Sequence, residues 1–160
     1  MEKEDKYSEL MINIRKIVRA INLESKRVEK QFGLSIPQLL TLKYLRDSKG
    51  FKRSMKEIKN YLSLNASTVT GIISRLDSKG FVARLPSVED KREIPIILTS
   101  KGLEIVKKTD ESLHERILFK TNAMKKEEYL SILVSLEKII QIFDIKDIDA
   151  SPIISGPTDI

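Results

Sequence analysis

One stretch of the chain places small polar and basic side chains on a single helical face, which is what a helix needs to reach base edges in DNA. From about Ala66 to Lys79, apolar residues recur at helical spacing and form a buried stripe: Val69, Ile72, Ile73 and Leu76. The other face and the cap supply the candidate DNA contacts: Asn65, Ser67, Thr68, Thr70, Gly71, Ser74 and Arg75. Short hydroxyl side chains let a helix approach the major groove, whereas long acidic ones would obstruct it. The alternative is a solvated face that tolerates serine and threonine.

A basic turn follows this segment and supplies further candidate contacts. Two short β-prone runs flank a polar stretch and predict a two-stranded hairpin: residues 81–85 and 94–98. Arg84 in the first run and Lys91 and Arg92 at the tip are candidate DNA contacts, and a narrow minor groove attracts a guanidinium. Asp90 is too acidic to face phosphate, so we expect it to orient Arg92 or Arg84 through a charge-assisted hydrogen bond. The alternative is a solvated turn.

Two short capped helices precede the candidate contact helix and position it. Ser35 with Gln38, and Ser54 with Glu57, match the capping-box spacing and predict that a helix begins after each serine. Two short helices, a tight turn at residues 63–65, the contact helix and a hairpin follow the order of a winged helix-turn-helix. Pro95 cannot donate to a β-ladder, so we expect its strand to lie at a sheet edge.

Three longer segments carry apolar stripes that a small lobe cannot cover. Helical spacing predicts long helices at residues 7–31, 100–121 and 125–143, followed by a non-helical tail. Exposed stripes of that length mark an interface, so we expect a homodimer. The best candidates belong either to the interface or to the core: Tyr129, Leu133, Leu136 and Ile140.

Composition excludes several classes of site. The 160 residues include no cysteine and one histidine, His114, which argues against thiolate catalysis and against a cysteine or multi-histidine metal site. We find no glycine-rich phosphate loop and no nucleophile with a neighbouring base, so we expect no catalytic residues, no cofactor and no enzyme. We expect His114 to be solvent-exposed or at a dimer contact. The charged N-terminus and the lack of a long apolar stretch predict a cytoplasmic protein without a membrane partner.

Positive charge gathers in the middle of the chain. Residues 49–101 contain eleven basic and five acidic residues, a net charge of +6, whereas residues 102–160 contain eight and eleven, a net charge of −3. A basic middle suits a nucleic-acid-binding lobe on a scaffold of another kind. The alternative is a solvated basic face.

Two motifs together resemble the MarR family of winged helix-turn-helix transcriptional regulators. The segment Asp90-x-Arg92-(five residues)-Leu98-Thr99-x-x-Gly102 resembles the family's wing signature, and the run from Ser67 to Arg84 is similar to its recognition helix and first wing strand. The resemblance covers about residues 7–143. It implies a mainly α fold with a small β-hairpin wing, built as one domain over residues 1–160. The DNA-binding lobe would span residues 34–99, the helical dimerisation lobe residues 7–31 and 100–143, and the tail residues 144–160.

The resemblance also implies a function. It implies homodimers that bind double-stranded DNA at pseudo-palindromic operators and repress transcription until a small ligand, often an aromatic acid, releases them. Some members have a basic residue where Gly71 stands. Two other functions also fit the residues: a winged-helix module that binds proteins, and a DNA-binding regulator without a small-molecule effector.

A crevice between the two lobes would hold such a ligand. The first three helices supply its candidate lining: Leu10, Ile14, Ile17, Leu39, Leu42, Tyr44 and Leu62. Nearby cations suit an amphipathic acid: Arg15, Lys16, Arg19 and Lys43. The alternative is that these apolar side chains are plain core.

Overall fold

The fold is mainly helical, with a small antiparallel sheet. The computed structural model describes residues 3–86, 94–109 and 112–148. The described helices are α1 (Lys3–Phe32), α2 (Ile36–Arg46), α3 (Met55–Leu62), α4 (Ala66–Ser78), α5 (Ser100–Lys107), α6 (Leu113–Ala123) and α7 (Lys126–Ile142). The strands are β1 (Lys52–Ser54), β2 (Val82–Arg84) and β3 (Pro95–Leu98), and a short 3₁₀ turn, η1 (Lys49–Phe51), precedes β1. The predicted fold class is confirmed.

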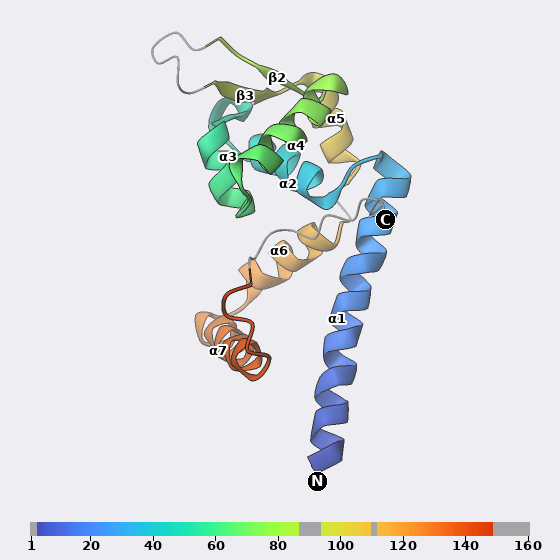
Figure 1. The fold of residues 1–160 in the computed structure, drawn as a ribbon. Helices are drawn as coiled ribbons and strands as arrows, with labels where there is room; N and C mark the ends of the chain where they lie inside the picture. The colour runs from blue at the N-terminus through green and yellow to red at the C-terminus, as the bar shows by residue number, and fades with distance from the viewer. Residues whose placement is uncertain (1–2, 87–93, 110–111, 149–160) are drawn as a thin grey trace.

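The elements form one compact lobe with two helical extensions (Figure 1). Helices α2 to α5 and the sheet make the lobe, and α1 runs away from it with its N-terminal end farthest off. Helix α6 starts near the upper part of α1 and runs away from it, and α7 lies to one side, apart from α1. The lobe therefore presents α4 and the base of the wing at a distance from α7.

Local sequence signals explain where the helices of the lobe begin and end. Ser35 Oγ accepts the Gln38 N–H at 3.4 Å, and the Gln38 side chain accepts the Ser35 N–H at 3.1 Å. Ser54 and Glu57 form the same reciprocal pair at the start of α3, so both predicted capping boxes are confirmed. Gly80, at φ 72°, ends α4 in the left-handed conformation that glycine adopts without strain.

The sheet contains one strand that the sequence did not predict. Its order is β1-β3-β2, so β3 is the central strand and the expected edge position of Pro95 was wrong. Pro95 is nevertheless tolerated because it is the first residue of β3 and lies opposite Ser54, the last residue of β1. Its carbonyl accepts a hydrogen bond from the Leu85 N–H at 2.9 Å. The predicted hairpin pair corresponds to β2 and β3.

The predicted long helix at residues 100–121 is two helices. Helix α5 ends at Lys107, and α6 begins at Leu113 with Ser112 as its N-cap. Thr109 Oγ1 donates to the Val106 carbonyl at 2.6 Å, and the Thr109 carbonyl accepts the Ser112 N–H at 3.0 Å. Hydroxyl side chains that bond to nearby backbone compete with helical hydrogen bonding, and here they favour a break.

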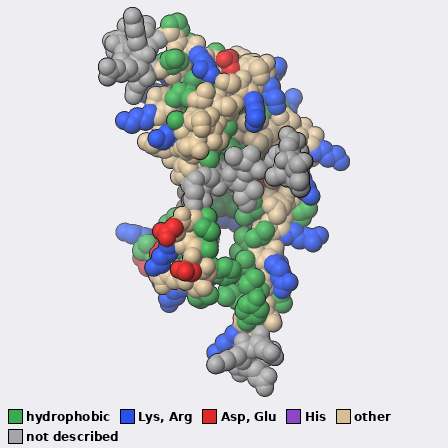
Figure 2. Space-filling view, in the orientation of Figure 1, with side chains coloured by type: hydrophobic (Ala, Val, Ile, Leu, Met, Phe, Trp, Pro, Cys, Tyr) green, Lys and Arg blue, Asp and Glu red, His purple; other side chains and the backbone are tan. Residues whose placement is uncertain are grey.

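The core lies inside the lobe, and the extensions leave much apolar surface open. The apolar side chains most fully buried come from α1 to α5, from strands β2 and β3, and from the loop between α1 and α2: Val28, Leu34, Leu39, Leu42, Leu45, Ile58, Val69, Ile73, Leu76, Val82, Ile96 and Val106. In contrast, α7 buries none of its described side chains. Figure 2 shows apolar side chains gathered along the extensions below the lobe. None of the helices in the described ranges is long and apolar enough to cross a membrane.

Candidate nucleic-acid interface

Helix α4 has a buried stripe and an open polar face, as its sequence predicts. Val69, Ile73 and Leu76 are fully buried. The opposite face exposes Ser67, Thr70, Ser74 and Arg75, while Gly71 and Thr68 are half-buried. Asn65, also exposed, is the N-cap and accepts the Thr68 N–H at 2.9 Å. The structure thus brings these sequence-predicted residues together on one surface.

The hydroxyl groups on this face are ordered by neighbouring protein atoms. Ser67 Oγ donates to Asn65 Oδ1 at 2.7 Å, and Thr70 Oγ1 donates to the Ala66 carbonyl at 2.9 Å. Ser74 Oγ instead accepts a hydrogen bond from Arg84 Nη2 at 3.0 Å. Ser67 and Thr70 thus use their protons within the protein, whereas Ser74 uses a lone pair.

Arg84 reaches from β2 onto the exposed end of α4. Its Nε lies 3.7 Å from Asp77 Oδ2, and both side chains are partly exposed. Sequence analysis missed Asp77, although it is the one acidic residue of α4 and was a visible signal on an otherwise neutral or basic face. The expected partner, Asp90, and the expected contacts Lys91 and Arg92 lie outside the described residues.

The residues expected to line a ligand crevice have different surroundings in the structure. Leu39, Leu42 and Leu62 are at most 2% exposed and belong to the core of the lobe. Ile17 is exposed and Leu10 half-buried on α1. Tyr44 stacks on Tyr61, with 4.1 Å between the ring centroids. Leu39, Leu42 and Leu62 therefore lie where the alternative placed them, in the hydrophobic core.

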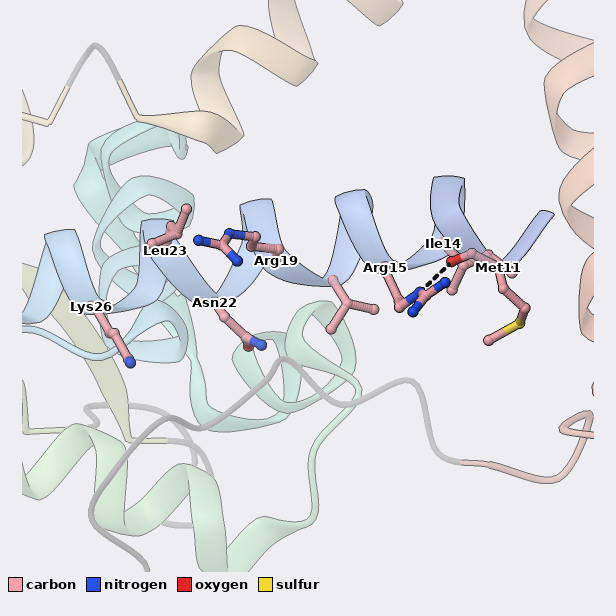
Figure 3. A pocket seen from close by; sticks show the side chains of 8 residues that line it. Met11, Ile14, Arg15, Arg19, Asn22, Leu23 and Lys26 are labelled. Carbon is pink, nitrogen blue, oxygen red and sulfur yellow. Dashed lines mark hydrogen bonds between the residues drawn. The ribbon is translucent and has the colours of Figure 1, made fainter. Parts of the chain in front are cut away.

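An open groove follows one face of α1 instead (Figure 3). It encloses about 630 Å³, and the residues that line it are Met11, Ile14, Arg15, Val18, Arg19, Asn22, Leu23 and Lys26. Ile14 is the member of the predicted lining that it contains, and Arg15 and Arg19 are two of the predicted nearby cations. Apolar side chains and cations thus combine on α1, in a groove whose lining residues all come from that helix.

An ion cluster of Lys43, Arg46 and Glu115 joins the lobe to α6. Lys43, predicted to be a cation near the crevice, is 1% exposed; it hydrogen-bonds to Glu115 and to the Thr109 carbonyl, the latter at 3.3 Å. Arg46 Nη2 lies 3.2 Å from Glu115 Oε1. Burial alone would raise the pKa of Glu115, but the hydrogen bond and charge of Lys43, together with Arg46, hold it below its ordinary value.

The single histidine lies beside this cluster and is half-buried, rather than freely exposed as one expectation had it. Burial lowers the pKa of His114, and the charge of Lys43 lowers it further. Among the described residues, no group of three or more His, Cys, Asp or Glu side chains could hold a metal ion.

Comparison with known proteins matches this arrangement to one family. The MarR family model matches residues 34–94. The HTH-type transcriptional regulator TtmR of Methylorubrum extorquens is 38% identical over 77 residues, a match that spans 48% of this chain and 38% of TtmR. The HTH-type transcriptional repressor YetL of Bacillus subtilis is 32% identical over 94 residues, covering 59% of this chain and 56% of YetL. The chain thus spans less than two thirds of either relative.

The fold is shared with a solved member of that family. Sco3205, a MarR family transcriptional regulator from Streptomyces coelicolor solved in complex with DNA, superposes with a TM-score of 0.67 at 18% identity, covering 95% of this chain and 96% of that one. At that identity the likeness shows the fold. The family-model match over residues 34–94, the regulator relatives and the shared fold together show that this chain is similar to DNA-binding transcriptional regulators of the MarR family.

Proposed function

We propose that this protein is a homodimeric, cytoplasmic repressor that binds a pseudo-palindromic operator through α4 and the wing. The observation that carries the proposal is the exposed face of α4, where hydroxyl groups and Arg75 stand opposite a fully buried stripe. Such a face can enter the major groove and bring short polar side chains to base edges. The relative YetL is named a repressor, which supports the direction of regulation.

The proposed contacts divide into three groups. The base-reading group is Ser67, Thr70, Gly71 and Ser74. The phosphate-contacting group is Asn65, Thr68 and Arg75, near the ends and flank of α4. Arg84 also belongs to the proposed DNA-binding face, where it lies against Ser74. The wing group is Lys91 and Arg92, with Asp90 orienting its basic neighbour. A cation contributes affinity for any sequence, whereas a contact to a base edge contributes specificity.

A second copy of the chain is proposed to cover the apolar surface of α1, α6 and α7. Large apolar side chains there are between 40% and 77% exposed, including Ile17, Phe119 and Leu133. Soluble monomers rarely leave such contiguous apolar surface in water. Sedimentation at micromolar concentration is expected to give a dimer, and a well-folded monomer would contradict this.

A small aromatic acid is the proposed effector, and its proposed site is the part of the groove on α1 that the second copy leaves open. Apolar residues of the groove suit a ring, and Arg15, Arg19 and Lys26 suit a carboxylate. Salicylate-like acids should raise the unfolding temperature and weaken DNA binding together. Stabilisation without weaker DNA binding would leave a ligand site but no switch, and no shift at millimolar acid would leave a regulator without this effector.

Two substitutions on α4 separate base reading from phosphate contact. Arg75→Ala is expected to weaken binding to most sequences alike, by about 1–2 kcal/mol, and to reduce the salt slope by about one. Thr70→Ala is expected to change the preferred sequence. Both are measured by selecting bound fragments from random DNA and titrating them at several salt concentrations. If Arg75→Ala reshapes the selected sequence and Thr70→Ala leaves it intact, the two roles are reversed.

Gly71→Ala is expected to stabilise the protein and weaken DNA binding at once. A Cβ at Gly71 would meet no heavy atom within 4 Å, and alanine favours a helix over glycine by about 0.5–1 kcal/mol. The added methyl group projects where a base edge would approach, so we expect a loss of affinity of roughly 1 kcal/mol, or about fivefold. Urea unfolding and DNA titration measure the two effects. Unchanged affinity would show that DNA does not approach α4 at this residue.

A further inference from the structure

The hydroxyl groups on α4 differ in what they have left to offer DNA. A serine or threonine hydroxyl has one proton to donate and two lone pairs that accept. Where a protein atom already takes the proton, the hydroxyl presents lone pairs to DNA. Where a protein donor already uses a lone pair, the proton stays free.

Thr70 and Ser67 already donate their protons within the protein. The Thr70 hydroxyl donates to the Ala66 carbonyl at 2.9 Å, one turn earlier in α4. The Ser67 hydroxyl donates to Asn65 Oδ1 at 2.7 Å, and Asn65 is fixed as the helix cap by the Thr68 N–H. Both side chains are exposed, so their lone pairs remain open to solvent.

Ser74 has the opposite arrangement. Its Oγ accepts a hydrogen bond from Arg84 Nη2 at 3.0 Å, and within the described part of the chain it donates none. Arg84 is placed there by its strand, since β2 pairs Arg84 with Ile96, and by Asp77 at 3.7 Å from its Nε. A guanidinium donates and never accepts, so it always meets a lone pair of Ser74.

From these contacts we propose that α4 presents an ordered pattern of hydrogen-bond polarity to DNA, with acceptors at Ser67 and Thr70 and a donor at Ser74, and that Arg84 and Asp77 are the positioning pair that sets the donor. This rests on the proposed function. An acceptor selects an exocyclic amino group, the N4 of cytosine or the N6 of adenine. A donor selects a base acceptor, namely guanine O6 or N7, adenine N7 or thymine O4. Thr70 and Ser74 are one helical turn apart, so the two selected groups lie roughly 6 Å apart along the helix, or about two base pairs.

Base analogues in a selected DNA fragment test the two polarities. The fragment is first obtained from random DNA with the full chain, and Thr70→Val and Ser74→Ala identify the positions that depend on each hydroxyl. At the Thr70 position, removing the amino group with purine or 2-pyrimidinone analogues should weaken binding about fivefold, and Thr70→Val should show no such loss. At the Ser74 position, removing the base acceptor should also weaken binding about fivefold. The analogues are 7-deazapurines for N7, 2-aminopurine for guanine O6 and 5-methyl-2-pyrimidinone for thymine O4. Ser74→Ala should be insensitive to that change.

Arg84→Ala tests the positioning pair, with Asp77→Asn as a milder second variant. Arg84 uses one of the two Ser74 lone pairs and so restricts the direction of the hydroxyl proton. Without Arg84 the hydroxyl can rotate freely, so the penalty of the acceptor-deleting analogue should fall at the Ser74 position. The amino-deleting penalty at the Thr70 position should stay unchanged. A purely structural or phosphate role for Arg84 would instead lower affinity on every fragment and leave both analogue penalties intact, which would overturn the positioning role.

The outcomes separate this inference from the function on which it rests. A Ser74 position that is sensitive to loss of an amino group, or a Thr70 position sensitive to loss of an acceptor, overturns the polarity pattern while DNA binding stands. If the wild-type chain selects no DNA fragment, the proposed function fails and the pattern fails with it. Circular dichroism of each variant confirms that the helices remain folded.

Discussion

Gly102→Ala is expected to destabilise the protein by about 3 kcal/mol, toward the upper end of what overpacking usually costs. A Cβ at this position would lie 2.1 Å from the Phe81 carbonyl oxygen and 2.7 Å from Leu98 Cδ1. The oxygen cannot retreat freely, because it accepts the Thr99 N–H at 3.1 Å where β3 passes into α5. We expect α5 to move off the base of the wing, which lowers the urea midpoint of unfolding and also weakens DNA binding.

Gly71→Ala is the matched control for that experiment. Both substitutions add one methyl group inside a helix, and both gain the same helix propensity. The space differs, since a Cβ at Gly71 meets nothing within 4 Å. Opposite signs of the change in unfolding free energy would assign the loss at Gly102 to the clash. A loss below about 0.5 kcal/mol at Gly102 would show that the backbone around Phe81 yields easily.

The parts of the fold that the sequence predicted well are those set by local chemistry. Both capping boxes, the left-handed Gly80 and the buried stripe of α4 depend on residues within a few positions of each other. Helical periodicity also fixed which face of α4 is open, because burying Val69 and Ile73 leaves Thr70 and Ser74 outside. The predicted contact face could therefore be drawn without knowing the tertiary structure.

The parts that it predicted poorly depend on contacts between distant residues. Strand β1 has three residues, too few for an alternating pattern, and it exists because β3 offers a partner. Periodicity shows that Leu39 and Leu42 face inward but not what they face, so for these two residues the sequence could not separate core from ligand lining. Asp77 was missed for the same reason, since its partner Arg84 comes from the next strand.

The ion cluster at the base of α6 gives the second large effect. Glu115→Ala is expected to cost about 3 kcal/mol, because it leaves the charge of Lys43, which is 1% exposed, without a carboxylate. Lys43→Met is expected to cost far less, about 1 kcal/mol or below. The loss is small because the two partners of Lys43 keep other hydrogen-bonding partners in that variant. Glu115 still has Arg46 at 3.2 Å, and the Thr109 carbonyl still accepts the Ser112 N–H at 3.0 Å. Urea unfolding of the two variants measures the asymmetry, and equal losses would contradict it.

Acid should remove the contribution of Glu115, and the direction follows from its pKa. The folded pKa of Glu115 lies below its ordinary value of 4.5, so the folded state holds the proton less tightly than the unfolded chain does. The stabilisation is therefore fully present above about pH 5 and is lost as the pH falls through the folded pKa. Glu115→Gln keeps the shape and removes the charge. The difference in unfolding free energy between wild type and Glu115→Gln should be constant from pH 5.5 to 7 and shrink below pH 4.5. A difference that stayed constant at lower pH would show that packing of the side chain, and not its charge opposite Lys43, holds α6 to the lobe.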